Sequence, residues 1–73
     1  LNAHGKTERA QLERGTEKFL LVLDGAVTAM LDQKEYPLAA NDTLYFDASI
    51  PHQLVNTAGK QARVFCSVAS AKF

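Results

Sequence analysis

Turn-forming residues recur at short intervals along most of this chain, and they leave room for little except short strands. From Lys18 onward, compact apolar or β-branched stretches alternate with small groups of Asp, Asn, Gly, Ser and Lys. Strands that recur every 8–12 residues or so, joined by tight turns, are typical of a β-sandwich or β-barrel. The sequence therefore predicts an all-β fold. Strands are expected near Phe19–Leu23, Ala26–Leu31, Glu35–Leu38, Thr43–Phe46, His52–Asn56 and Arg63–Ala69.

An Asp-Gly pair and a proline give more specific expectations. Asp24 and Gly25 lie between two apolar segments. This is the pattern of a two-residue hairpin, in which both turn positions need or tolerate a positive φ. We therefore expect the strands on either side to pair with each other. Pro37 has no N–H to donate to a strand ladder, so it should lie on an edge strand or at a bulge.

The N-terminal part of the chain has no clear strand pattern. Residues 7–14 are mostly polar and include good helix formers such as Ala10 and Leu12. This segment fits a short helix, a frayed arm or an edge strand. We accordingly expect an N-terminal arm or edge strand at residues 1–16 and a barrel at residues 17–73.

Size and charge exclude several classes of protein. With 73 residues the chain forms one domain, and so small a domain buries only about 60% of the surface that its unfolded chain exposes. Eight basic and eight acidic residues give no net charge, which disfavours direct nucleic-acid contact because counterion release needs a positive excess. No apolar run is long enough to cross a membrane. The single cysteine, Cys66, cannot form an internal disulfide, which is consistent with a cytoplasmic location.

Three stretches carry a family resemblance. Residues 41–56 read NDTLYFDASIPHQLVN, residues 15–25 read GTEKFLLVLDG, and residues 62–73 form a final strand that ends in phenylalanine. The first two resemble the second and first signature motifs of the cupin superfamily, and the resemblance covers about residues 12–73. It implies a small antiparallel double-stranded β-helix, the jelly-roll barrel of cupins, either complete or lacking one or two N-terminal strands.

The first motif departs from the family pattern at its metal ligands. In cupins this motif supplies two histidines and a glutamate, and the corresponding positions here are Leu12, Arg14 and Lys18. In the second motif, His52 matches the family's histidine and Asn56 its asparagine. A transition metal needs three or more nitrogen or carboxylate ligands. We therefore predict no metal or other cofactor; if a metal does bind, His52 is the residue that would hold it.

Strand alternation predicts what the barrel would enclose instead. If Lys18 points inward, so do Leu20 and Val22, whereas Phe19, Leu21 and Leu23 face outward. A cation inside an apolar barrel is costly unless it is paired, which favours a small anionic organic ligand. Two alternatives remain: the Lys18 ammonium extends to the barrel mouth, or His52 has only a structural role. The predicted ligand-binding residues are Lys18, Leu20, Met30, Tyr45, His52, Leu54 and Cys66.

The resemblance also suggests a biological role. The tail is similar to that of cupin domains that follow a helix-turn-helix domain in bacterial transcriptional regulators, where the cupin senses an effector. We therefore expect a non-catalytic ligand-binding domain, and a homodimer formed through the stripe of outward apolar side chains on the Phe19–Leu23 strand. The alternatives are a metal-dependent isomerase or oxygenase that uses His52, and a purely structural dimerisation domain.

Overall fold

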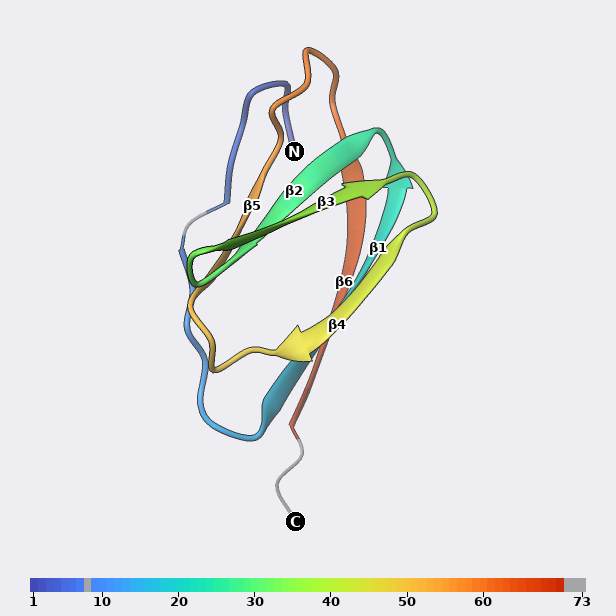
Figure 1. The fold of residues 1–73 in the computed structure, drawn as a ribbon. Helices are drawn as coiled ribbons and strands as arrows, with labels where there is room; N and C mark the ends of the chain where they lie inside the picture. The colour runs from blue at the N-terminus through green and yellow to red at the C-terminus, as the bar shows by residue number, and fades with distance from the viewer. Residues whose placement is uncertain (8, 71–73) are drawn as a thin grey trace.

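The protein folds into six strands arranged as two sheets. The computed structural model describes residues 1–7 and 9–70, and Figure 1 shows the two layers. One sheet has the order β4-β1-β6 and the other the order β3-β2-β5, with every pair antiparallel. The predicted all-β class is thus confirmed. The strands are β1 (Thr16–Asp24), β2 (Ala26–Leu31), β3 (Lys34–Ala39), β4 (Thr43–Asp47), β5 (His52–Val55) and β6 (Arg63–Ser70).

The core lies between the facing sheets and follows strand alternation. On β1, Leu20 and Val22 are buried at 2% and 0% exposure, while Leu23 on the other face is 47% exposed. This confirms the predicted inward and outward sets on that strand. From the opposite sheet, Val27 and Ala29 pack with Val22 in one apolar cluster. Each strand therefore contributes alternate side chains to a single apolar layer between the sheets.

The Asp24-Gly25 turn is not a hairpin, so that prediction is wrong. The strands that it joins, β1 and β2, belong to different sheets, and the chain crosses from one layer to the other at this point. Gly25 has a φ of 79°, and a Cβ placed there would lie 3.1 Å from the Cα and Cβ atoms of Ala62. A positive φ is compatible with a corner between sheets as well as with a hairpin, so the dipeptide could not distinguish them.

The predicted turn and edge around β3 are confirmed. β2 and β3 form a hairpin around Asp32 and Gln33, with Leu31 opposite Lys34. Asp32 adopts a φ of 56°, which a short polar side chain tolerates well. β3 is an edge strand, so Pro37 lies where its missing N–H costs a ladder bond least.

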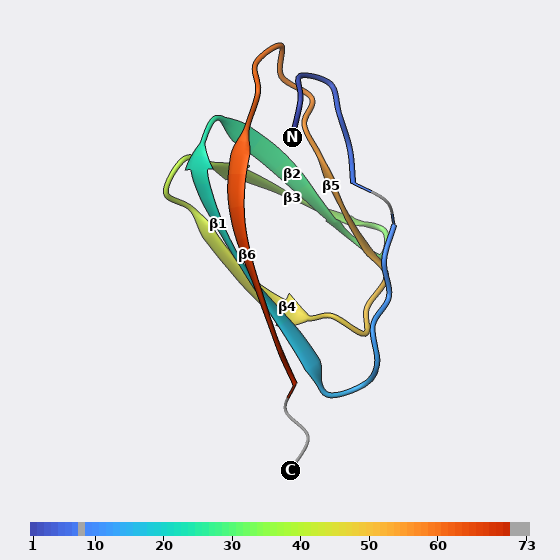
Figure 2. The same ribbon diagram turned by 180° about the vertical axis from the view of Figure 1, so that it is seen from behind.

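The N-terminal arm is an extended segment that covers the outer edge of β5. The Thr7 N–H donates to the Leu54 carbonyl. Ala10 and His52 exchange two backbone hydrogen bonds, and the Leu12 N–H donates to the Ala48 carbonyl. Figures 1 and 2 show the arm running beside β5. None of the described residues of this segment is helical, and it contacts β5 through isolated β-bridges at Lys6 and Ala10 without forming a strand of its own. The arm satisfies β5 backbone groups that would otherwise be unpaired.

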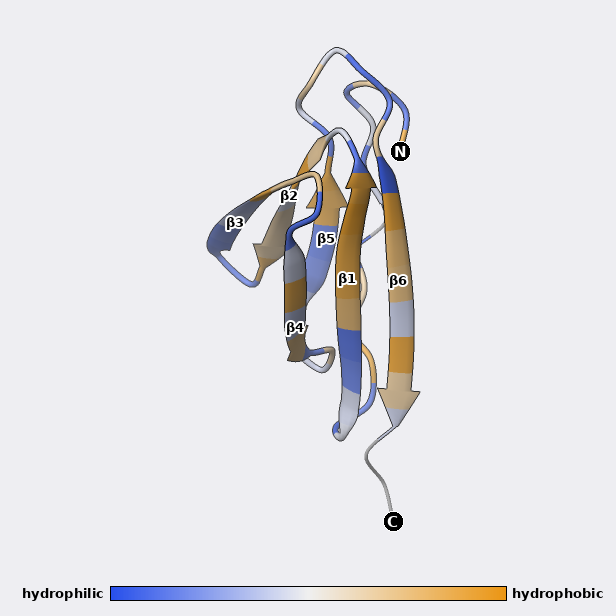
Figure 3. Cartoon of the chain, turned by 90° about the vertical axis from the view of Figure 1, so that its right-hand side faces the viewer, coloured by the Kyte–Doolittle hydropathy of each residue, from blue (hydrophilic) through white to orange (hydrophobic). Residues whose placement is uncertain are grey.

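The outer face of the β4-β1-β6 sheet is rich in apolar side chains. Tyr45 and Phe65 are 65% and 49% exposed on this face, opposite Phe19 and Leu21 of β1. Figure 3 shows apolar residues running along β1 and β6. Among the described residues, no second layer covers this side of the sheet. The terminal phenylalanine used in the sequence comparison, Phe73, lies outside the described residues.

Candidate functional site

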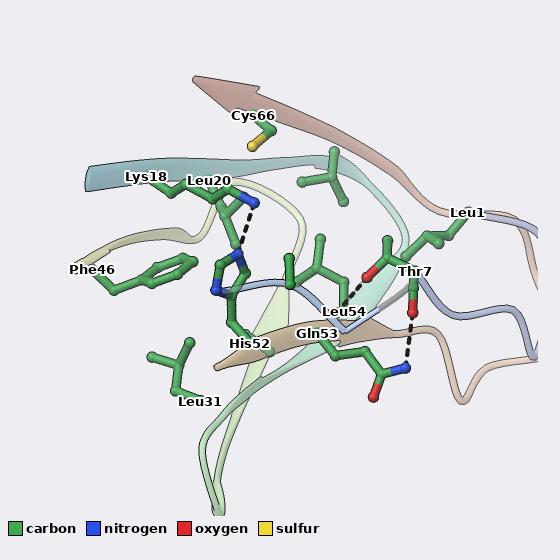
Figure 4. Close-up of a pocket in the computed structure, with 13 residues that line it drawn as sticks. Leu1, Thr7, Lys18, Leu20, Leu31, Phe46, His52, Gln53, Leu54 and Cys66 are labelled. Carbon is green, nitrogen blue, oxygen red and sulfur yellow. Dashed lines mark hydrogen bonds between the residues drawn. The ribbon is translucent and has the colours of Figure 1, made fainter. Parts of the chain in front are cut away.

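A cavity of about 380 Å³ opens between the two sheets. Most of its lining is apolar, and the Lys18 ammonium enters it from β1 (Figure 4). It is at the small end of the 300–1,000 Å³ typical of ligand pockets. The lining residues are Leu1, Thr7, Ala10, Lys18, Leu20, Ala29, Leu31, Phe46, His52, Gln53, Leu54, Val64 and Cys66.

Lys18 and His52 meet inside this cavity. The Lys18 Nζ lies 2.7 Å from the His52 Nε2, and the His52 Nδ1 lies 2.8 Å from the Ile50 carbonyl oxygen. A carbonyl only accepts, so Nδ1 must carry the proton and donate it. An ammonium only donates, so Nε2 must be the accepting, unprotonated nitrogen. The two contacts together specify a neutral imidazole that accepts a hydrogen bond from a charged lysine.

The surroundings of His52 hold its ring in place. The residue opens β5 directly after Pro51 and is only 7% exposed. Its backbone exchanges two hydrogen bonds with Ala10 of the arm, each 2.8 Å long. The Phe46 ring meets the imidazole edge-on, with centroids 5.1 Å apart and an interplanar angle of 67°. An imidazole fixed at its backbone, ring face and Nδ1 has little freedom to turn away from Lys18.

A short polar turn sets the approach to His52. The Asp47 Oδ1 accepts hydrogen bonds from the Ser49 backbone N–H at 2.9 Å and from its hydroxyl at 2.8 Å. This Asx-type turn ends β4 and directs the chain into the Ile50-Pro51 bend. Both bonds lower the pKa of the Asp47 carboxyl, and the bond from the Ser49 backbone N–H has the larger effect. The turn therefore links the end of one sheet to the position of the imidazole in the other.

Lys18 brings an ammonium into this apolar space, and none of the described acidic residues is bonded to it. It lies on β1, between the inward-facing Thr16 and Leu20, and is half-buried. In the part of the chain that the structure describes, its one side-chain hydrogen bond is the contact with His52. An ammonium has three N–H donors, so two of them remain available. Figure 4 places this group beside His52 and Cys66 at one end of the cavity.

The donor set does not fit a transition metal. The His52 Nε2 lone pair that would bind a metal is directed at the Lys18 ammonium, and the other ring nitrogen is bonded to a backbone carbonyl. Within residues 1–7 and 9–70, no group of three His, Cys, Asp or Glu side chains is close enough to hold an ion. A cation at Lys18 would in addition repel a metal at its neighbour.

Five of the seven predicted ligand-binding residues line the cavity together. They are Lys18, Leu20, His52, Leu54 and Cys66. Tyr45 lies on the outer face of β4, where a hydrogen bond with Glu17 raises the pKa of its hydroxyl. Met30 also lies outside the cavity. Neighbouring residues take their places: Phe46 on β4 and Leu31 and Ala29 on β2. Whether the five residues bind a ligand stays a prediction.

Some lining residues carried a signal in the sequence, and others carried none. Phe46 pairs with Lys18 across β1 and β4, so the correct register would have placed it inward. Val64 follows in the same way from the alternation of β6. The arm residues Leu1, Thr7 and Ala10 have no periodic pattern that predicts a role in the wall of a cavity.

Asn56 anchors the arm near this site. Its side chain is completely buried. The Nδ2 donates to the carbonyls of Asn2 at 3.0 Å and Lys60 at 2.7 Å, and the Oδ1 accepts from the Ala58 N–H at 3.1 Å. This one amide therefore joins the start of the chain to the loop between β5 and β6. It explains in physical terms why an asparagine follows the histidine in this motif.

Comparison with known families identifies the fold. The model of the Cupin domain family matches residues 1–68, which is nearly the whole chain. The protein belongs to the cupin family. The paired antiparallel sheets and the position of His52 at the start of β5 agree with this assignment. No curated protein matches the sequence.

Several solved structures superimpose well on this one. The cupin domain of an XRE family transcriptional regulator from Enterobacter cloacae matches with a TM-score of 0.83 at 20% identity, over 93% of this chain and 70% of that one. A protein from Thermus thermophilus has the same TM-score at 21% identity, over 97% and 66%. A sugar phosphate isomerase of the cupin superfamily from Silicibacter pomeroyi has a TM-score of 0.80 at 26% identity, over 99% and 46%.

These matches differ in how much of each protein the cupin covers. It spans about two thirds of the first two structures and less than half of the isomerase. At these identities the likeness to the regulator domain and the Thermus protein establishes the fold alone. Across the described residues, no helix is long and apolar enough to cross a membrane.

Proposed function

We propose that this cupin is a non-catalytic domain that binds a small anionic organic molecule and senses it for a bacterial transcriptional regulator in the cytoplasm. The observation that carries the proposal is the Lys18 ammonium inside an apolar cavity, bonded to a neutral His52 and, among the described residues, to no carboxylate. A half-buried cation of this kind gains most from a ligand that brings a negative charge.

The bonding of His52 supports binding rather than catalysis. A general base needs a free lone pair within reach of a substrate proton. Here Nε2 already accepts from Lys18, and Nδ1 donates to the Ile50 carbonyl. In this arrangement His52 is a positioning residue that holds the ammonium, and Lys18 is the group that would meet the ligand.

The regulatory part of the proposal has a separate source of support. The Enterobacter cloacae structure is a domain of a transcriptional regulator and has a TM-score of 0.83 to this cupin. The balanced charge of this chain is consistent with a domain that leaves DNA contact to another part of a regulator.

We also propose that the domain works as a homodimer through the outer face of the β4-β1-β6 sheet. Leu23, Tyr45 and Phe65 are exposed there next to the half-buried Phe19 and Leu21. Exposed apolar surface of this kind is commonly covered by a partner, and the zero net charge removes long-range repulsion between copies.

Light scattering after gel filtration tests the dimer. We expect the wild-type protein to elute as a dimer and the Phe65→Glu variant as a monomer. Ile50→Glu, which alters an exposed apolar residue in the loop between β4 and β5, should remain dimeric. A wild-type protein that is monomeric at every concentration would refute this proposal.

A ligand screen by thermal unfolding tests the binding function. Carboxylates, sulfonates and phosphates would be added to the wild-type protein, to Lys18→Met and to Lys34→Met, the last being an exposed lysine at the start of β3. A ligand at 100 times its Kd stabilises the folded state by about 2.7 kcal/mol, which is a rise in Tm of roughly 10–20 °C for a domain this small. We expect such rises in the wild-type protein and Lys34→Met, but not in Lys18→Met.

Other outcomes would favour the alternatives. If no charged or neutral compound stabilises the protein, a purely structural dimerisation domain becomes the better description. If Lys18→Met responds as the wild type does, the ligand is not held as an anion. Stoichiometric nickel, zinc, iron or manganese that is lost in His52→Ala would instead favour a metal-dependent isomerase or oxygenase. The Silicibacter pomeroyi structure is a sugar phosphate isomerase of the cupin superfamily.

A further inference from the structure

Several hydrogen-bonding groups of the cavity are already bonded within the protein. Both nitrogens of His52 are bonded, as described above. The Thr7 hydroxyl accepts from the Leu54 N–H at 2.9 Å, and the Gln53 amide donates to the Thr7 carbonyl at 2.8 Å. In Figure 4 these two contacts lie at the Leu54 end, away from Lys18. Thr7, Gln53 and Cys66 are neutral, so the two remaining N–H groups of Lys18 are the charged donors that these side chains offer to a ligand.

This distribution defines the head group of a ligand. Two N–H donors on one ammonium suit an acceptor-only group that carries a negative charge. Lysine acts as a point charge without the planar fork that arginine offers to phosphate. None of the described residues that line the cavity is an arginine, and the structure shows no helix N-terminus in the described residues that could add further donors. A single carboxylate matches this supply better than a phosphate does.

The rest of the lining defines the body of the ligand. Beyond Lys18 the walls consist mainly of Leu20, Ala29, Leu31, Phe46, Leu54 and Val64. A sugar hydroxyl placed against these side chains would lose its hydrogen bonds to water and find no replacement. Each such loss costs about 1–3 kcal/mol, so a polyol is rejected, whereas a hydrocarbon body gains free energy for each methylene buried.

We infer that the ligand of this cupin is a monocarboxylate with a compact apolar body, and not a sugar phosphate. The inference rests on the proposed binding function and specifies its ligand. The carboxylate accepts from Lys18, and the apolar part extends along Leu20 and Leu54 toward Leu1. The volume of about 380 Å³ limits the body to a short chain or a single ring.

Isothermal titration calorimetry with a series of probes tests this inference. The probes are butanoate, hexanoate, octanoate and dodecanoate, with hexanol, glucose 6-phosphate and inorganic phosphate for comparison. We expect the Kd to fall about fourfold for each added methylene, and the gain to stop once the chain fills the cavity. Hexanol should bind at least tenfold more weakly than hexanoate in the wild-type protein.

Variants separate the charge from the apolar body. In Lys18→Met the preference for hexanoate over hexanol should disappear, whereas Lys34→Met should retain it. Leu54→Asn should weaken octanoate more than butanoate, because the polar side chain removes apolar wall and leaves the ammonium intact. Circular dichroism of each variant confirms that the comparison is made between folded proteins.

The outcomes distinguish this inference from the proposed function. If glucose 6-phosphate binds in a Lys18-dependent way and the carboxylates do not, the inference is wrong and the anion-binding function stands. The inference is also wrong if affinity does not change with chain length. If none of the probes binds and the wider screen also finds no ligand, both are wrong.

Discussion

Replacing Asn56 by aspartate changes almost nothing in shape and should nevertheless bring the domain close to unfolding. The side chain is fully buried, and its Nδ2 donates to the carbonyls of Asn2 and Lys60. In Asn56→Asp an oxygen would face those carbonyls. Two hydrogen bonds are lost, each worth about 1–1.5 kcal/mol, and their acceptors are left unsatisfied. An uncompensated buried charge raises the total cost to about 3–5 kcal/mol at neutral pH.

That cost is large relative to the stability of so small a domain. At about 0.05–0.15 kcal/mol per residue, a chain of this length is stable by roughly 4–11 kcal/mol. Urea denaturation followed by circular dichroism measures the difference, with Asn41→Asp as the control because Asn41 is exposed. A loss of less than about 1 kcal/mol in Asn56→Asp would refute the role assigned to this amide.

The effect should also depend on pH with a defined sign. Burial against carbonyls raises the pKa of the introduced carboxyl in the folded state above its unfolded value of about 4. The destabilisation is therefore complete above the folded-state pKa, decreases as pH falls, and is smallest below the unfolded-state pKa of about 4, where the carboxyl is neutral in both states. A gap between variant and wild type that widens on acidification would contradict this explanation.

Three further predictions concern the corner between the sheets and the approach to the cavity. Gly25→Ala should lower the free energy of unfolding by about 2 kcal/mol, because φ is 79° and the added Cβ meets the loop before β6. In the control Gly59→Ala the added Cβ meets nothing within 4 Å, so the free energy of unfolding should change by less than about 0.5 kcal/mol. Thermal unfolding measures both. Ser49→Ala should raise the pKa of Asp47 partway toward its usual value, as followed by NMR, since the backbone bond remains. In the wild type the stabilisation from this lowered pKa is present above the ordinary carboxyl pKa and is lost as pH falls through the lowered one. The 15N spectrum of His52 at neutral pH should show a protonated Nδ1 and an unprotonated Nε2, and the reverse tautomer would contradict the Lys18 contact.

Local pattern predicted the strands of this fold but not how they are distributed between the sheets. The ranges expected for β2 and β4 agree with the structure to within a residue. The Asp24-Gly25 pair misled because hairpins and corners both use a positive φ. The pairing of the strands depends on the two sheets burying their inner apolar faces against each other, which is a property of the whole fold. In this protein that requires β1 to pair with β4 and β6, neither of which is adjacent in sequence.

The site residues could be predicted only on strands where the sequence indicated which alternate side chains point inward. Lys18 fixed the phase of β1, and Leu20 followed correctly. On β4 and β2 no residue indicated which side chains point inward. Tyr45 and Met30 were predicted to line the cavity, but their neighbours Phe46, Ala29 and Leu31 line it instead. The contact between Lys18 and His52 joins two sheets and depends on both registers, so no single segment of sequence contains it.

The order of the strands has a consequence for the timing of folding. β1 is the central strand of its sheet, and one of its two neighbours, β6, is the last strand of the chain; Thr16 lies opposite Ser70. At about 5–20 residues per second of synthesis, roughly 3–11 seconds separate the appearance of these two partners. During that interval the apolar side chains of β1 have no complete sheet to join. The β1 side chains are therefore open to non-native association for longer than those of a strand whose partners follow at once, and non-local pairing of this kind favours slow folding.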